Sequence, residues 1–322
     1  MISLWAPDGV GEVRPGDDLA DHLVPLLVGD AELRDGDVVC VTSKVVSKAE
    51  GRAEAGARAD AIERETRRLV ARRGPLSIVV NRLGLTMAAA GVDASNVEAG
   101  HVLLLPLDPD ATARRLRRAL AARCGANVGV LVTDTAGRPW REGQTDLAIG
   151  AAGVRVLDDH AGRSDPYGNT LAVTAPAVAD ELAGAAELAA GKLGRRPFVV
   201  VRGRGDVVLD PDDDGPGAAA LLRAVGADLF GLGAREAVLT ALRGVEGVRP
   251  VFGAPVDVDE LLGVLASVAA PTPPTMSADA GSVVVTTDDA RVRWTCQVAA
   301  YAHGWRVSDT DASRIRLVPA AP

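Results

Sequence analysis

Short runs of apolar, mostly β-branched residues, each followed by polar side chains, constrain the fold of this chain most strongly. Residues 38–42 (VVCVT), 128–132 (VGVLV) and 198–202 (FVVVR) are such runs. Their length and composition are typical of buried strands. The segments with apolar residues at helical spacing that alternate with strands are 17–29, 54–73, 111–122, 175–193 and 218–225. Alternation over residues 17–230 predicts a mixed α/β core, and we expect an α+β protein with a mixed sheet.

The length and the C-terminal composition predict the domain organisation. A chain of 322 residues is long enough for two lobes and a tail. Residues 269–275 (AAPTPPT) have the composition of a linker, and beyond them we expect a strand at 282–287, a helix at 293–302 and a last strand. We therefore predict a main domain over residues 1–250, a helix and Pro-rich linker over 251–275, and a small α/β extension over 276–322.

Charge and cysteine content exclude several classes of function. The net charge of −8, from 43 acidic and 35 basic residues, argues against a nucleic-acid-binding surface. Cys40, Cys124 and Cys296 are far apart in the sequence, which suits a reducing compartment. The chain begins without a signal-peptide pattern and has no apolar run of about 20 residues. We expect a soluble, cytoplasmic protein without nucleic-acid or membrane partners.

Several common catalytic motifs are missing. The sequence has no G-x-x-x-x-G-K-[ST] phosphate loop, no complete dinucleotide fingerprint and no G-x-S-x-G elbow. The four histidines are scattered without a partner at zinc-site or triad spacing. A nucleotide would therefore have to be bound by other means, and histidine acid–base catalysis is not expected.

Oxygen-bearing side chains gather at loops and strand ends. They are Asp93, Asn96, Asp134, Thr135, Asp146, Asp165 and Asn169. Hard cations such as Mg²⁺ or Mn²⁺ bind carboxylates and hydroxyls and often share phosphate oxygens with a substrate. The alternative is that Asp93 and Asp134 only cap turns, in which Asp is a favoured residue. Composition alone leaves both interpretations open.

A basic set follows the same strand ends. Its members are Lys44, Lys48, Arg138, Arg141 and Arg202. Each alone is typical of a solvated surface cation. Their recurrence beside loops favours phosphate binding, because phosphate needs cationic donors that converge from several segments.

Seven segments, in order along the chain, resemble the coenzyme F420:L-glutamate ligase family. They are residues 14–19 (RPGDDL), 35–39 (DGDVV), 41–52 (VTSKVVSKAEGR), 90–97 (AGVDASNV), 134–146 (DTAGRPWREGQTD), 165–169 (DPYGN) and 179–181 (ADE). The resemblance covers about residues 2–232. It implies that GTP phosphorylates a carboxylate of the deazaflavin precursor F420-0, and that the amine of L-glutamate then attacks the acyl phosphate to form a γ-glutamyl amide. It also implies a two-lobed α+β ligase core that forms an intertwined homodimer.

The same resemblance implies roles for individual residues. Asp93 and Asp134 would bind one divalent cation and Thr135 a second, with Mg²⁺ or Mn²⁺ expected and K⁺ as a further ion. Asp93, Asp134 and Lys48 are the residues that we expect to act in catalysis. The residues expected to bind GTP are Val10, Gly11, Glu12, Val13, Ser43, Lys48, Asn96, Arg202 and Gly203.

Two other functions are compatible with these motifs. A non-catalytic scaffold of the same fold could bind the deazaflavin or GTP, although the presence of Asp93, Asp134, Thr135 and Lys48 argues against it. A metal-dependent phosphohydrolase would use the same carboxylates on water, and product analysis with and without glutamate distinguishes it. Some actinobacterial relatives carry a fused flavin-binding reductase domain. Residues 250–322 are too short for one, so we expect the ligase part only.

Overall fold

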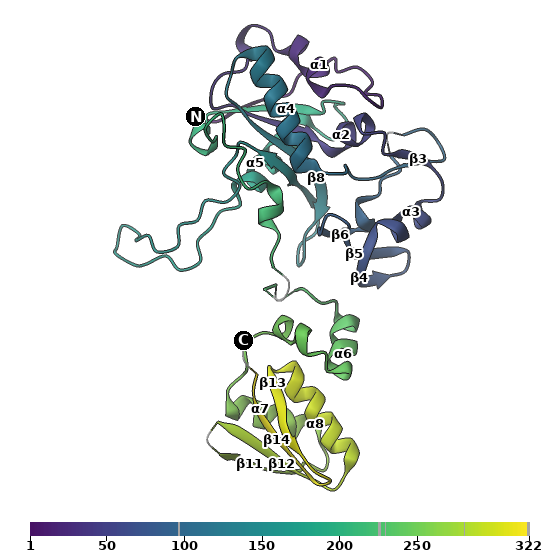
Figure 1. Cartoon of the computed structure of the whole chain (residues 1–322), viewed down its shortest axis with the longest axis vertical. Coiled ribbons are helices and arrows are strands. Elements are labelled where there is room, and N and C mark those ends of the chain that lie inside the picture. The colour runs from purple at the N-terminus through teal and green to yellow at the C-terminus, as the bar shows by residue number, and fades with distance from the viewer. Residues whose placement is uncertain (96, 225–226, 229, 280, 321–322) are drawn as a thin grey trace. The chain divides into compact units, whose positions relative to one another are not determined.

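The chain forms two compact units. The computed structural model describes residues 1–95, 97–224, 227–228, 230–279 and 281–320 (Figure 1). The N-terminal unit comprises residues 1–69 and 74–222, and the C-terminal unit comprises residues 70–73 and 223–322. In the described part of the chain, no helix has both the length and the apolar character needed to cross a membrane.

A five-stranded mixed sheet forms the centre of the N-terminal unit. Its strands, in spatial order, are β1 (Ser3–Trp5), β10 (Phe198–Arg202), β2 (Val38–Thr42), β8 (Gly129–Gly137) and β9 (Gln144–Ala152). Strands β2 and β8 are parallel, and the other neighbours are antiparallel. The expected α+β fold with a mixed sheet is therefore confirmed, and the three valine-rich runs form its centre.

Both faces of this sheet are covered, because successive strand residues point to opposite sides. Val39 and Val41 of β2 pack in one cluster with helices α1 (Leu19–Leu23), α2 (Ser43–Ala49) and α4 (Pro109–Cys124). Val38 and Cys40 pack in a second cluster with α5 (Val178–Ala190). The N-terminal unit thus has three layers, with the sheet in the middle.

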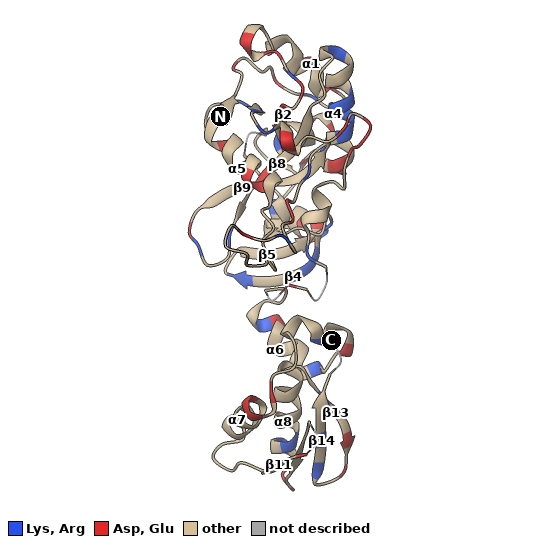
Figure 2. Cartoon of the chain, turned by 90° about the vertical axis from the view of Figure 1, so that its left-hand side faces the viewer, with Lys and Arg blue, Asp and Glu red and all other residues tan. Residues whose placement is uncertain are grey.

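Local sequence signals set the limits of α4. The carboxylate of Asp108 accepts a hydrogen bond from the amide of Ala111, and Gly125 ends the helix with φ of 69°. Figure 2 shows basic residues along α4 close to acidic residues around α1. Arg123 contributes to this pairing, with Nη2 2.6 Å from Asp18 and Nη1 2.6 Å from Asp21. These pairs connect the start of the chain to α4.

Two smaller sheets lie in the first half of the chain, and residues 70–73 of one of their strands are grouped with the C-terminal unit. One contains β3 (Ala53–Ala55) and β7 (His101–Leu103), and the other contains β4 (Thr66–Arg73), β5 (Leu76–Asn81) and β6 (Thr86–Ala88). The paired strands expected at residues 76–91 are confirmed. The single helix expected at residues 54–73 is wrong, because α3 (Arg58–Glu65) ends where β4 begins. Pairing of β4 with β5 replaces the continued helix, and β-branched Thr66 and Val70 suit a strand.

The C-terminal unit is a four-stranded antiparallel sheet with helices. Its strands are β11 (Thr275–Asp279), β12 (Ser282–Thr286), β14 (Arg314–Pro319) and β13 (Trp305–Thr310) in spatial order. Its helices are α6 (Ala234–Arg243), a 3-10 helix (Glu246–Phe252), α7 (Val258–Val268) and α8 (Ala290–Ala302). Leu261, Leu265 and Trp305 lie in its core. The strand and helix expected after the Pro-rich segment are confirmed.

The limits of the compact units differ from the expected domain boundary. We placed the main domain at residues 1–250 and a linker at 251–275, whereas the units divide between residues 222 and 223. The reason is that α7 supplies Leu261 and Leu265 to the C-terminal core, and Tyr301 donates a hydrogen bond to the carbonyl of Val245. Residues 245–269 therefore help to form that core. The assignment of ligase function to residues 1–250 stays a prediction.

Candidate active site

The carboxyl ends of the two parallel strands bring the first site residues together. Thr42 at the end of β2 lies opposite Thr133 of β8, so Ser43 and Asp134 follow at the same edge of the sheet. Ser43 is buried at the start of α2, and its Oγ donates a hydrogen bond of 2.7 Å to Asp134 Oδ1. Two residues that are 91 positions apart in sequence thus share a hydrogen bond.

The hairpin of β8 and β9 adds a second carboxylate. Asp146 lies opposite Thr135 in the register of the two strands and is 6% exposed. Its carboxylate accepts hydrogen bonds from Thr135 Oγ1 at 2.7 Å and Thr133 Oγ1 at 3.1 Å. The sequence placed Asp146 only in a polar stretch, because the cross-strand register that joins it to Thr135 was not predicted.

Burial controls the ionisation of Asp134. Loss of solvent raises its pKa, the negative charge of Asp146 adds to this effect, and the hydrogen bond from Ser43 opposes it, so that the pKa reaches about 6. An ionised Asp134 is therefore poorly stabilised by the protein alone. A cation at this position would offset the charge, so the residues present fit the divalent ion that we expected.

Lys44 links this strand end to the loop that carries Asp93. The loop is fixed to β7, since the backbone amide of Asp93 donates to the carbonyl of Leu103 at 3.0 Å. Lys44 Nζ forms an ion pair with Asp93 and donates to Ser95 Oγ at 2.7 Å. Burial opposes ionisation of Asp93, but hydrogen bonds from Lys44 and Ser95 outweigh it and lower the pKa of this carboxyl. The positive charge of Lys44 also acts on Asp134.

The oxygen donors at this edge suit a hard cation only in combination with other ligands. Asp93, Asp134 and Thr135 offer carboxylate and hydroxyl oxygens, which Mg²⁺ and Mn²⁺ prefer. Among the described residues, no group of three or more His, Cys, Asp or Glu side chains could hold a metal ion by itself. Water and substrate oxygens are the further ligands that Mg²⁺ commonly keeps when one or two carboxylates bind it. Asn96, which was expected to bind the nucleotide, lies outside the described residues.

The N-terminal segment at residues 10–13 meets helix α2. Val13 is buried in the core and Val10 packs against it, so the backbone between them, with Gly11, is held close to the sheet. Lys48 Nζ lies 2.5 Å from Glu12 Oε1, and this hydrogen bond with its ion pair lowers the pKa of Glu12. Two segments that were expected to bind GTP therefore lie beside each other.

The sequence did not identify Lys192 as a site residue. We expected a helix through residue 193, but α5 ends at Ala190 and Gly191 turns the chain with φ of 67°. Lys192 Nζ then donates a hydrogen bond of 2.7 Å to Thr135 Oγ1, and it lies 3.5 Å from Glu187. The helix-ending glycine is the one signal that could have placed this lysine outside the helix.

Arg202 and Gly203 lie at the other end of the strands from Ser43 and Asp134. Strand β10 is antiparallel to β2, so its last residues lie beside the start of β2 and not beside Ser43. Arg202 donates through Nε and Nη2 to the buried carboxylate of Asp37, at 2.9 and 2.7 Å. Gly203 approaches Met1 so closely that a Cβ atom would lie 2.1 Å from the Met1 carbonyl oxygen. These contacts hold both residues within the fold, and their expected contacts with GTP stay a prediction.

The remaining polar candidates lie in exposed loops. Arg138 and Arg141 belong to the turn between β8 and β9, where Arg138 Nη2 donates to the carbonyl of Glu142 at 3.0 Å. Asp165 accepts hydrogen bonds from the amide of Tyr167 at 2.9 Å and of Asn169 at 2.8 Å. This pattern is that of a turn-capping Asp.

Fold and site together define an α+β protein with carboxylates, hydroxyls and lysines gathered at the end of two parallel strands. The family model described as F420-0:Gamma-glutamyl ligase matches residues 9–58 and 54–203. The chain therefore belongs to the F420-0:γ-glutamyl ligase family and is an enzyme. The resemblance deduced from the seven sequence segments is confirmed.

Relatives from archaea agree with this membership. The coenzyme F420:L-glutamate ligase of Methanopyrus kandleri is 42% identical over 245 residues, which cover 68% of this chain and 93% of that protein. The proteins of the same name from Archaeoglobus fulgidus and Haloarcula marismortui are each 40% identical, over 223 and 227 residues. These matches cover 63% and 62% of this chain, and 88% and 87% of the two relatives.

Proposed function

We propose that this enzyme joins L-glutamate to the deazaflavin precursor F420-0 through a γ-glutamyl amide, at the expense of GTP. The γ-phosphoryl group of GTP is transferred to a carboxylate oxygen of the precursor, and GDP leaves. The amine nitrogen of glutamate then attacks the carbonyl carbon of the acyl phosphate, inorganic phosphate leaves, and the nitrogen loses a proton. Family membership and the names of the relatives support this reaction.

The observation that carries the proposal is the junction of Ser43, Asp134 and Lys44. It combines a partly buried carboxylate of raised pKa with an ammonium group that also pairs with Asp93. Phosphoryl transfer requires charge neutralisation and alignment more than a special nucleophile, and these groups supply both. Asp93, Asp134 and Thr135 would hold Mg²⁺ or Mn²⁺, which neutralises the charge on the transferred phosphoryl group.

The lysines around this junction have distinct tasks in the proposal. Lys48, in the last turn of α2, pairs with Glu12. Its ammonium group would bind GTP phosphates, because a phosphate oxygen can replace the Glu12 carboxylate as its partner. The Lys192 side chain is 60% exposed, and its Nζ donates a hydrogen bond to Thr135 Oγ1. It would orient the second anionic group, the acceptor carboxylate or the phosphate formed from it.

The direct test is mass spectrometry of the deazaflavin product. The full chain is incubated with F420-0, GTP, L-glutamate and Mg²⁺ or Mn²⁺, and product with added glutamate is expected only when all are present. Asp134→Asn should lower turnover by about a hundredfold or more, because it weakens a group that stabilises charge in the transition state. Near-normal turnover of this variant, with an unchanged metal requirement, contradicts the assignment.

The same assay separates the two alternative functions. A phosphohydrolase releases phosphate from GTP equally well without glutamate, whereas the ligase releases phosphate in step with amide formation. A non-catalytic scaffold binds GTP or the deazaflavin and forms no product under any of these conditions.

We also propose that the enzyme is a homodimer. Figure 1 shows the segment between β9 and α5 leaving the N-terminal unit as a long arm. Its two sides are joined by backbone hydrogen bonds, among them His160 to Thr174 at 2.9 Å and Leu171 to Arg163 at 2.8 Å. Tyr167 and Val173 are 91% and 92% exposed on it. An extended arm with bare apolar side chains suits contact with a second copy, and light scattering should give twice the 33.1 kDa chain mass.

A further inference from the structure

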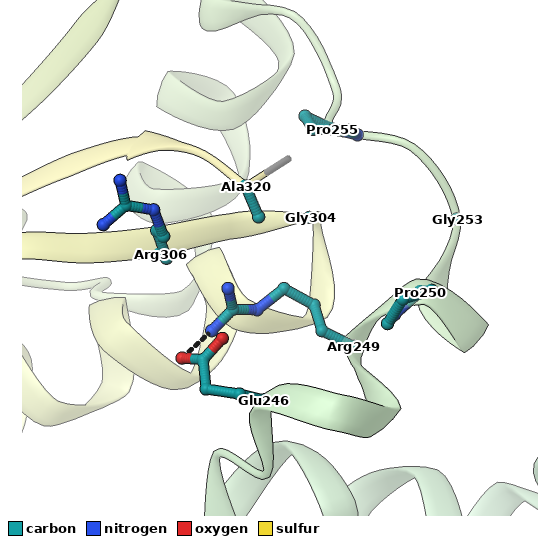
Figure 3. A pocket seen from close by; sticks show the side chains of 8 residues that line it. All are labelled: Glu246, Arg249, Pro250, Gly253, Pro255, Gly304, Arg306 and Ala320. Atoms are coloured by element: carbon teal, nitrogen blue, oxygen red, sulfur yellow. Dashed lines mark hydrogen bonds and ion pairs between the residues drawn. The ribbon is translucent and has the colours of Figure 1, made fainter. Parts of the chain in front are cut away.

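The C-terminal unit contains a pocket that the proposed ligase site does not use. Its volume is about 270 Å³, and it is lined by Glu246, Arg249, Pro250, Gly253, Pro255, Gly304, Arg306 and Ala320 (Figure 3). All eight residues belong to the C-terminal unit. The pocket is at the lower end of the size range of small-molecule sites, so a ligand has to be compact.

Arg249 is the central group of this pocket. It is 6% exposed, and its Nη2 donates a hydrogen bond of 2.5 Å to Glu246 Oε1. Its Nε is buried and has no hydrogen-bond partner among the residues that the structure describes. A buried cationic donor that lacks an acceptor among these residues is unfavourable, and an anion beside the guanidinium would stabilise it.

Aromatic contacts hold the Arg249 guanidinium in place. Its central carbon lies 4.7 Å from the centroid of the Tyr301 ring, a distance typical of a cation–π contact. The Tyr301 ring packs edge-on against Phe252, with centroids 5.6 Å apart, and its hydroxyl donates to the carbonyl of Val245. The donor is therefore positioned before any ligand arrives, which lowers the entropy lost on binding.

The opposite wall is built from closely spaced backbone. Gly304 has φ of 78°, and a Cβ atom on it would lie 2.6 Å from Cα of Pro255. Next to it, Trp305 Nε1 donates a hydrogen bond of 2.9 Å to the carbonyl of Val256. This contact fixes the segment with Pro255 against the start of β13. The shape of the pocket thus depends on a glycine and a buried tryptophan.

The charged side chains of the pocket carry a net positive charge. Arg249 and Arg306 contribute two positive charges, and the carboxylate of Glu246 offsets one of them. Figure 3 shows the Arg249 side chain extending from the 3-10 helix toward the strand that carries Arg306. We propose that this pocket binds a small oxyanion, the carboxylate or phosphate group of a compact metabolite, through the Arg249 guanidinium with Arg306 as the second cation.

The experiment follows the Arg249 side chain itself. Arginine Nε–Hε signals are recorded by NMR on the ¹⁵N-labelled full chain during titration with inorganic phosphate, and separately with acetate. The Arg249 signal is identified as the one that is missing from the spectrum of Arg249→Lys. In the wild-type protein, its nuclear Overhauser contact to the Tyr301 ring identifies it independently. We expect a saturable shift of this signal with at least one of the two anions, and their relative affinities show which source of oxyanion the pocket favours.

Variants distinguish the pocket from general charge effects and from the ligase site. Arg306→Gln should weaken binding about tenfold, the effect of one lost charge-assisted contact. Arg243→Gln removes the same charge from α6, outside the pocket, and should leave the affinity unchanged. Asp134→Asn should leave the Arg249 response unaltered, even if ligation is lost. The absence of a saturable Arg249 shift beyond that caused by chloride at equal ionic strength, or equal weakening by Arg243→Gln and Arg306→Gln, overturns the proposal.

Discussion

The raised pKa of Asp134 connects the proposed site to folding stability. Its pKa rises from 3.8 to about 6 on folding, chiefly through burial. The folded state therefore binds a proton more tightly than the unfolded state. This group lowers the free energy of unfolding as the pH rises from about 4 to about 6, and above about pH 6 the loss stays constant.

We predict that Asp134→Asn removes this pH dependence. At pH 7 the free energy of unfolding of the variant should exceed that of the wild type by about 1 to 3 kcal/mol, since each pKa unit corresponds to about 1.4 kcal/mol. Below about pH 4 the difference should vanish. Urea unfolding of both proteins, in metal-free buffer across this pH range, measures it. A variant that is less stable than the wild type at pH 7 contradicts the prediction.

A comparison of two lysines tests the nucleotide contact. Lys48→Ala should raise the KM for GTP by about tenfold to a hundredfold, because one charge-assisted contact to phosphate is lost. Lys44→Ala should raise it less, since the resemblance to the ligase family assigns only Lys48 to the nucleotide, whereas Lys44 pairs with Asp93 and Ser95. Steady-state kinetics with varied GTP measures both values. An equal or larger effect at Lys44 contradicts the assignment of the main phosphate contact to Lys48.

At the scale of elements, close packing of α4 against β9 sets the position of Asp146. Gly150 of β9 lies under the first turn of α4, where an added Cβ would be 2.5 Å from the carbonyl carbon of Pro109. In the same region Asp110 Oδ1 accepts a hydrogen bond of 2.7 Å from the amide of Ala151. The strand that carries Asp146 can keep its place only with a glycine at position 150.

We therefore predict that Gly150→Ala destabilises the protein by about 1 to 3 kcal/mol, the usual effect of overpacking. Gly137→Ala is the matched control in the same hairpin, because a Cβ atom there meets nothing within 4 Å. Its effect should stay within about 0.5 kcal/mol. Both free energies come from urea unfolding, and similar losses for the two variants would falsify this account of α4 and β9.

At the scale of the whole molecule, the compact units suggest where the chain can be divided. A cut after residue 272 separates Leu261 and Leu265 of α7 from Val283 and Trp305, which share one core. A cut after residue 222 follows the limit of the N-terminal unit. The two truncations differ in how much apolar surface they expose.

We predict that residues 1–222 retain GTP-dependent glutamate addition at equal concentration of folded protein, whereas residues 1–272 aggregate. Every residue of the proposed site lies before position 193, so the shorter chain keeps the chemistry. Circular dichroism, light scattering and product mass spectrometry compare the two chains. A folded, dimeric chain of residues 1–222 that adds no glutamate shows that residues 223–322 complete the active site.

The sequence by itself determined the elements whose signals are local. Valine-rich runs specified β2, β8 and β10, and collinear motifs specified the family. Buried strands and capped helices depend on neighbouring residues, which sequence displays directly. The pairs of Ser43 with Asp134 and of Lys48 with Glu12 both lie within segments that the sequence had singled out.

The tertiary structure alone decided which of these side chains meet. The register of β8 with β9 joins Thr135 to Asp146, and the end of α5 brings Lys192 to Thr135. Because β10 runs antiparallel to β2, Arg202 lies beside the start of β2, where it donates a hydrogen bond to Asp37, and not beside Ser43 at its end. Strand order, direction and register are set by packing between distant segments, and a one-residue change in register reverses the face of every side chain. For this reason the sequence indicated the residue types of the site, and only the packed sheet selected its members.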